Sequence, residues 1–151
     1  MLRYRIPRTW ARCLALVCLS VLLPLAASAQ VAALTDADRL AIRSVIQRQL
    51  DAFKRDDAPA AFELASPAIQ ARFRNAATFL AMVRESYQAV YRPKHVQFLE
   101  AEIADGQAVQ KVLVTGPDGE QVLAIYPMFH KPDGAWATDG CMLVALPSKS
   151  A

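Results

Sequence analysis

The chain has 151 residues and a formal net charge of +3, a length that favours one globular domain. Four of its 17 Lys and Arg residues lie in the first 12 positions, and without them 13 basic residues stand against 14 acidic ones. The rest of the chain is therefore close to neutral, which removes the main compositional support for nucleic-acid binding.

The first 29 residues have the pattern of a signal peptide. Arginines precede an apolar run from Cys13 to Ala26, and Ala27-Ser28-Ala29 offers the small residues that signal peptidase accepts. We expect Sec-type export to the periplasm or the exterior of a bacterium, with cleavage between Ala29 and Gln30. A bilayer requires about 20 apolar residues, and this run is shorter, so we expect cleavage and no membrane association afterwards. Anchoring in the membrane and lipidation at Cys18 are the weaker alternatives.

Residues 30–151 are predicted to form a single α+β domain, with helices over about 35–92 and strands over about 95–146. Thr35 begins an amphipathic helix whose apolar residues recur every three or four positions as far as Phe53. Acidic residues in its first turn complement the helix dipole.

Two short helices and one longer helix are predicted next. Asp57 and Ser66 are expected N-caps, each followed by a proline within the first turn. Asn75 or Thr78 caps the longer helix, which ends before Pro93 because a residue that precedes proline is pushed out of helical geometry.

The last third of the chain alternates β-compatible runs with Asp-Gly pairs. Such pairs favour the positive φ angles of tight hairpin turns, so consecutive runs become antiparallel neighbours. The sequence therefore predicts a four-stranded antiparallel meander covered by the helices on one face. Its runs are 96–103, 108–115, 121–129 and 135–146, and the Asp-Gly pairs begin at Asp105, Asp118 and Asp133.

Two features of these runs predict an irregular sheet with both faces covered. Pro127 cannot donate to a strand ladder, and Asp139-Gly140 is an Asp-Gly pair inside a run, so we expect β-bulges that bend the sheet. Residues 121–130 are apolar at both parities, which is typical of a strand covered on both sides. We expect helices on one face and a second copy of the protein on the other.

Several residues resemble those of a known family. They are Arg55-Asp56-Asp57, Phe62, Ser66-Pro67, Pro127-Met128, Asp133-Gly134, Trp136 and Asp139-Gly140-Cys141. With the order of helices and strands, they resemble the bacterial family named domain of unknown function 4864. The order of elements is similar to the cone-shaped, cystatin-like superfold of nuclear transport factor 2-like and ketosteroid-isomerase-like proteins. This resemblance implies an exported domain with no established activity.

A cone-shaped fold often holds a ligand between its helices and its sheet, so polar residues of the sheet are candidates for a site. Asp139 is the strongest candidate for a general base, because a carboxylate withdrawn from water in an apolar strand holds a proton more readily. Tyr126 or Tyr87 could donate a hydrogen bond beside it. The alternative, which we favour, is that Asp139 bonds to backbone groups at the bulge.

Tyr87, Tyr91 and Trp136 are the candidate walls of a ligand pocket. Cys141 is the single cysteine outside the leader, so no internal disulfide is expected. We expect a buried, inert thiol, with pairing between chains or redox chemistry as alternatives. His130 is expected at an exposed strand end, and no spacing of residues predicts a metal site.

The sequence predicts a binding domain rather than an enzyme. We expect non-catalytic binding of a small apolar ligand or a partner protein. The alternatives are a small lyase or isomerase with Asp139 as base, and a homodimeric structural or accessory protein. No motif for nucleophilic, phosphoryl or hydride chemistry is found, so no cofactor is expected.

Overall fold

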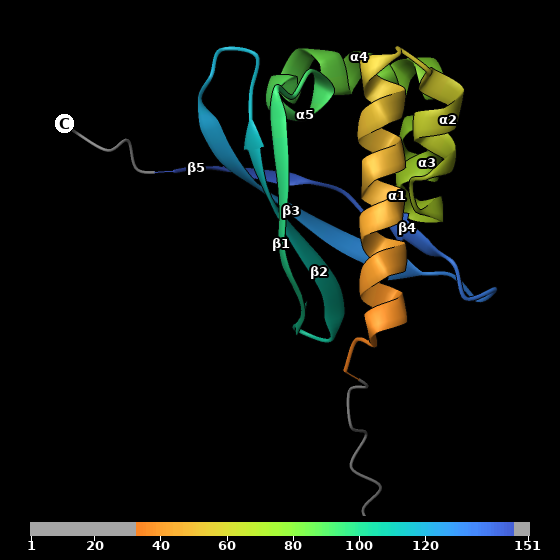
Figure 1. Cartoon of the computed structure of the whole chain (residues 1–151). Coiled ribbons are helices and arrows are strands. Elements are labelled where there is room, and N and C mark those ends of the chain that lie inside the picture. The colour runs from red at the N-terminus through yellow and green to blue at the C-terminus, as the bar shows by residue number, and fades with distance from the viewer. Residues whose placement is uncertain (1–32, 147–151) are drawn as a thin grey trace, which may run out of the picture. The chain divides into compact units, whose positions relative to one another are not determined.

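A computed structural model describes residues 33–146, which form helices gathered on one side of an antiparallel sheet (Figure 1). The predicted α+β class is confirmed, whereas the predicted signal peptide and its cleavage site lie outside the described residues. No helix within 33–146 is long and apolar enough to cross a membrane. The elements are α1 (Asp36–Lys54), α2 (Ala58–Glu63), α3 (Pro67–Phe73), α4 (Ala76–Ser86), α5 (Gln88–Tyr91), β1 (His95–Ala104), β2 (Gln107–Thr115), β3 (Gln121–His130), β4 (Trp136–Thr138) and β5 (Met142–Ala145).

The first four helices begin at polar caps. Thr35 and Asp38 form a capping box, in which each side chain accepts a hydrogen bond from the backbone N–H of the other residue. Asp57, Ser66 and Asn75 each accept one from the backbone N–H three residues later. These bonds satisfy donors that have no partner inside the helix, which is why the caps mark the helix starts.

The longer helix that we predicted up to Pro93 is divided at Tyr87 into α4 and α5. Tyr87 leaves helical geometry, with φ −130° and ψ 47°. The side-chain amide of Gln88 donates to the Arg84 carbonyl at 2.6 Å. In an uninterrupted helix that carbonyl would accept from the Gln88 backbone N–H. A side chain has therefore replaced a backbone bond at the break.

The first three strands form a meander, and two short strands share the place of a fourth. β1, β2 and β3 pair in sequence order, and β4 and β5 both pair with β3. The turn between β1 and β2 has positive φ at Asp105 and Gly106, +50° and +80°, as an Asp-Gly hairpin requires.

The fourth strand is interrupted opposite Pro127. Met128 pairs with Thr138 and Ile125 pairs with Met142, so three residues of one strand stand against two residues of the other. The Pro127 carbonyl accepts a hydrogen bond from the Asp139 N–H at 2.8 Å. In an extended strand the N and O atoms of one residue face the same neighbour. Because the Pro127 carbonyl faces the fourth strand, a backbone N–H at this position would face it too, and proline lacks that donor. The pairing of β3 with β2, on the other side, stays regular.

The core lies between α1 and the inner face of β2 and β3. Side chains of β2 alternate between half-buried and buried, and the buried set faces the helices. The buried set includes one polar residue, Gln110. Its amide donates to the carbonyl of Leu99, at a bulge of β1, and to the carbonyl of Lys111 on β2. The largest apolar contributions come from Ile42, Ile46, Leu50, Phe53, Val112, Val114, Tyr126 and Met128.

Candidate functional site

A cavity of about 470 Å³ lies between the helices and the interrupted part of the sheet. α1, α3 and α4 form one wall, and β3 with the segment between β4 and β5 forms the other. Its volume is within the usual range of small-molecule sites. The lining residues are mainly apolar, and they are Gln49, Phe53, Ile69, Arg72, Phe73, Phe79, Met82, Val83, Tyr87, Val90, Tyr126, Pro127, Thr138, Asp139, Gly140, Cys141 and Met142.

An aromatic cluster makes the helical wall of the cavity rigid. The Phe79 ring centroid lies 6.0 Å from that of Phe53 and 5.5 Å from those of Phe62 and Phe73. These are the separations at which tilted and edge-on aromatic pairs attract. The cluster joins α1, α2, α3 and α4, so the wall against which a ligand would pack is part of the core.

Tyr126 lines the cavity, and its buried hydroxyl has no hydrogen-bond partner. The residue is 2% exposed, and burial raises the pKa of its phenol well above the usual value because phenolate would be poorly solvated. Its polar neighbour is the Cys141 thiol, a weak hydrogen-bonding group that also contributes to the raised pKa. The phenol is therefore a neutral group with unused hydrogen-bonding capacity.

Gln49 and Arg72 are polar residues of this wall that the sequence reasoning did not identify, and Gln49 is the more deeply buried. Its amide nitrogen donates to the Ala61 carbonyl at 3.0 Å, which orients the amide oxygen as an acceptor. Gln49 occupies a position in the apolar spacing of α1, three residues after Ile46 and four before Phe53. A polar residue on the apolar face of a helix was the signal that could have revealed it.

Cys141 lines the cavity between β4 and β5 and forms no disulfide. Burial raises the pKa of its thiol to about 12, because a thiolate would be desolvated there. The thiol thus stays protonated at neutral pH. Thiolate chemistry of the kind that redox proteins use has no support from this environment.

Asp139 connects the helical half of the domain to the sheet. One carboxylate oxygen accepts from the Ser66 hydroxyl at 2.5 Å and the other accepts from the Gln107 amide at 3.2 Å. Neither Tyr87 nor Tyr126 forms a hydrogen bond with it. The three residues proposed for acid–base catalysis therefore line one cavity, but they do not converge into a hydrogen-bonded group.

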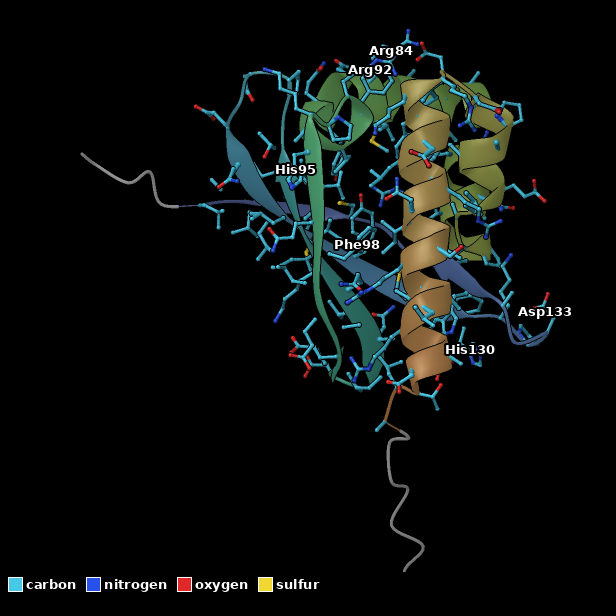
Figure 2. The ribbon with its side chains drawn as sticks, in the orientation of Figure 1. Arg84, Arg92, His95, Phe98, His130 and Asp133 are labelled. Atoms are coloured by element: carbon cyan, nitrogen blue, oxygen red, sulfur yellow. The ribbon has the colours of Figure 1, made fainter. Side chains whose placement is uncertain are left out.

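Tyr91 points away from the cavity into a surface cluster at the end of α1. Its hydroxyl donates to Asp56, and that bond is the main reason why the pKa of the Asp56 carboxyl lies below its usual value. Arg84 and Arg92 also donate to Asp56, at 3.1 and 2.8 Å, and the Arg92 guanidinium lies 4.2 Å from the Tyr91 ring centroid. Figure 2 shows Arg84 and Arg92 together at this end of the domain.

Trp136 also lies outside the cavity. Its indole N–H donates to Asp38 at 3.2 Å, and its ring stacks on the exposed His130 with centroids 4.4 Å apart. Figure 2 shows His130 near Asp133, in the hairpin between β3 and β4. Of the three predicted wall residues, the structure thus places Tyr87 at the cavity and puts Tyr91 and Trp136 elsewhere. Within residues 33–146 no group of His, Cys, Asp or Glu is placed to hold a metal ion.

The fold and the cavity define an α+β domain with an apolar internal site between helices and sheet. Residues 35–151 match the family described as Domain of unknown function (DUF4864). This match covers more than half of the chain, so the protein belongs to that family. No curated protein matches the chain.

The raised pKa of Cys141 predicts slow reaction with a disulfide reagent such as Ellman's reagent. At pH 8, a thiol of pKa about 12 is ionised about a thousandfold less than one of pKa 9.0, so labelling of the folded protein is expected to be slower by about that factor than labelling in guanidinium. The measurement uses a chain carrying Cys13→Ser and Cys18→Ser, which leaves one thiol. Equal rates in the two conditions would contradict the inert role.

Proposed function

We propose that this domain is an exported, non-catalytic binding module that holds a small, mainly apolar molecule in the cavity between its helices and its sheet. The observation that carries the proposal is Tyr126, which lines an apolar cavity and whose buried hydroxyl has no hydrogen-bond partner. A ligand with one hydrogen-bond acceptor, such as a carbonyl, would accept from this hydroxyl while its apolar body packs against the phenylalanine cluster.

The energetics support binding at this position. A buried polar group without a partner costs roughly 1–3 kcal/mol of folding free energy. A folded protein retains such a group only at a cost, and an acceptor on a ligand removes that cost on binding. The apolar wall contributes roughly 25 cal/mol for each Å² of apolar surface that leaves water.

Catalysis is not part of this proposal. The two oxygens of Asp139 accept hydrogen bonds from Ser66 and Gln107, and neither Tyr87 nor Tyr126 bonds to it. The lyase or isomerase alternative, which depends on Asp139, therefore finds no support in its bonding. The order of helices and strands and the bent, interrupted sheet support placing the domain in the cone-shaped class of nuclear transport factor 2-like and ketosteroid-isomerase-like proteins.

Replacing Tyr126 separates its role in binding from its role in folding. We expect the neutral fluorophore 6-propionyl-2-(dimethylamino)naphthalene, which carries a carbonyl, to bind saturably with a blue-shifted emission. Tyr126→Phe should weaken this binding about three- to tenfold, the worth of one neutral hydrogen bond. The same variant should raise the free energy of unfolding in urea, because it removes the unpaired hydroxyl.

A cavity-filling variant provides the matched control. Ile69→Trp places a larger side chain in the cavity and should lower the affinity for the fluorophore by at least about tenfold. Leu40→Trp makes the same kind of change at a residue that is 68% exposed on α1, and it should leave the affinity unchanged. Equal effects of the two variants, or full affinity in Tyr126→Phe, would refute the proposed site.

Export is the second element of the proposal, and it rests on the basic and apolar pattern of residues 1–29. Intact-mass analysis of the protein recovered from the periplasm of a bacterial host is expected to give the mass of a chain that begins at Gln30. A product that retains residues 1–29 would show that the segment is not a cleaved leader.

The third element is a homodimer formed through the outer face of the sheet. Leu113, Leu123 and Val144 lie side by side on β2, β3 and β5, on the face away from the helices. Val144 is 44% exposed. Lys111 and Glu102, which lie on this face, form an ion pair of 2.6 Å. A neutral apolar face is complementary to itself, so a two-fold pair of copies brings no like charges together.

Light scattering after size-exclusion chromatography tests this dimer. We expect the mass of two chains at concentrations of tens of micromolar, and the mass of one chain for Val144→Glu, because a buried unpaired charge is costly. Leu40→Glu introduces the same charge at an exposed leucine of α1 and should leave the dimer intact. A monomeric parent protein would refute the pairing without affecting the cavity.

A further inference from the structure

A second depression, of about 430 Å³, lies on a different side of α1. It is formed by α1, α2 and the hairpin between β3 and β4, and no residue that lines it also lines the apolar cavity. Its lining is markedly charged, with Arg48, Arg55 and Lys131 as cations and Trp136 as the aromatic wall. Its chemistry is thus opposite to that of the cavity proposed above.

The parts of this depression are held in place by the fold. Arg48 on α1 and Arg55, the C-cap of this helix, are seven residues apart, which puts them on one side of the helix, two turns apart. Lys131 belongs to a closed turn, in which its N–H donates to the Ala135 carbonyl at 2.7 Å. Trp136 is fixed by Asp38 and by the stacked ring of His130.

The cations of the depression have no carboxylate of their own. Within residues 33–146, none of Arg48, Arg55 and Lys131 forms an ion pair. Asp51 also lines the depression, where it accepts from Gln47 at 3.0 Å and pairs with Lys54 at 4.0 Å. Glu63 is the remaining acid, and the depression is therefore positive.

We propose that this depression binds a small phosphate monoester with a planar apolar part. Guanidinium and ammonium groups form their strongest hydrogen bonds with oxyanions, and a doubly charged phosphate suits three cations that line one depression better than a carboxylate does. His130 stacks on one face of the Trp136 indole, and the planar part of the ligand packs on the other face. The volume of the depression suits a small molecule rather than a protein segment. This proposal does not depend on the apolar cavity or its ligand.

Fluorescence of Trp136 provides a direct test. The experiment uses the chain with Trp10→Phe, which leaves Trp136 as the single tryptophan. We expect phenyl phosphate to change its emission saturably, with an affinity that falls as salt is added. Benzoate should bind several-fold more weakly. Benzylamine, which carries the opposite charge on the same ring, should not saturate.

Variants assign the effect to the depression. Arg48→Gln and Lys131→Gln should each weaken phenyl phosphate binding about tenfold, while Arg43→Gln, an exposed arginine of α1 outside the depression, should leave it unchanged. Urea unfolding curves establish that the variants are folded, and Lys131→Gln keeps the backbone hydrogen bonds that close the turn. Equal binding of benzylamine, or parental affinity in both lining variants, would overturn the proposal. Neither result would bear on fluorophore binding in the apolar cavity.

Discussion

The absence of a backbone N–H at Pro127 is the constraint on which the cavity depends. Proline cannot donate to the ladder, and its missing donor faces the fourth strand, so that strand cannot pair continuously with β3. The chain bulges instead, and Gly140 supplies a φ of +122° that other residues rarely adopt. The bulge brings Asp139, Gly140 and Cys141 to the cavity wall. A regular fourth strand would have replaced this wall with a continuous ladder.

The same bulge joins the two halves of the domain. Asp139 accepts from Ser66, which is also the N-cap of α3, and the backbone of Thr138 exchanges hydrogen bonds with Leu64 and Ser66 at 3.0 and 2.8 Å. Just after the C-terminal end of α1, Asp56 accepts hydrogen bonds from Arg84 of α4 and Tyr91 of α5. Asp56, Ser66 and Asp139, which are among the residues that carry the family resemblance, therefore hold elements of the fold together. In the proposed binding role, the selectivity of the cavity depends instead on Tyr126, Gln49 and the phenylalanine cluster.

The two proposed sites differ because their surroundings differ. In the cavity, burial keeps Tyr126 and Cys141 neutral, so recognition depends on shape and one hydrogen bond. In the depression beside Trp136, charged side chains remain near water, so recognition is electrostatic and sensitive to salt. In the proposed binding role, the unpaired Tyr126 hydroxyl costs the free protein stability and supplies a donor for the ligand. Such an exchange of stability for binding is common at functional sites.

The sequence alone determined the helix starts, the hairpin turns and the class of the fold, because each depends on residues that are close together in the chain. Thr35, Asp57, Ser66 and Asn75 act within three residues, and each Asp-Gly pair acts within its own turn. The tertiary structure alone decided which aromatic residues reach the cavity. Tyr91 bonds to a carboxylate 35 positions away and Trp136 to one 98 positions away, and both are thereby held outside it. Periodicity identifies the buried side of a strand or helix, but it carries no information on a partner so distant in sequence.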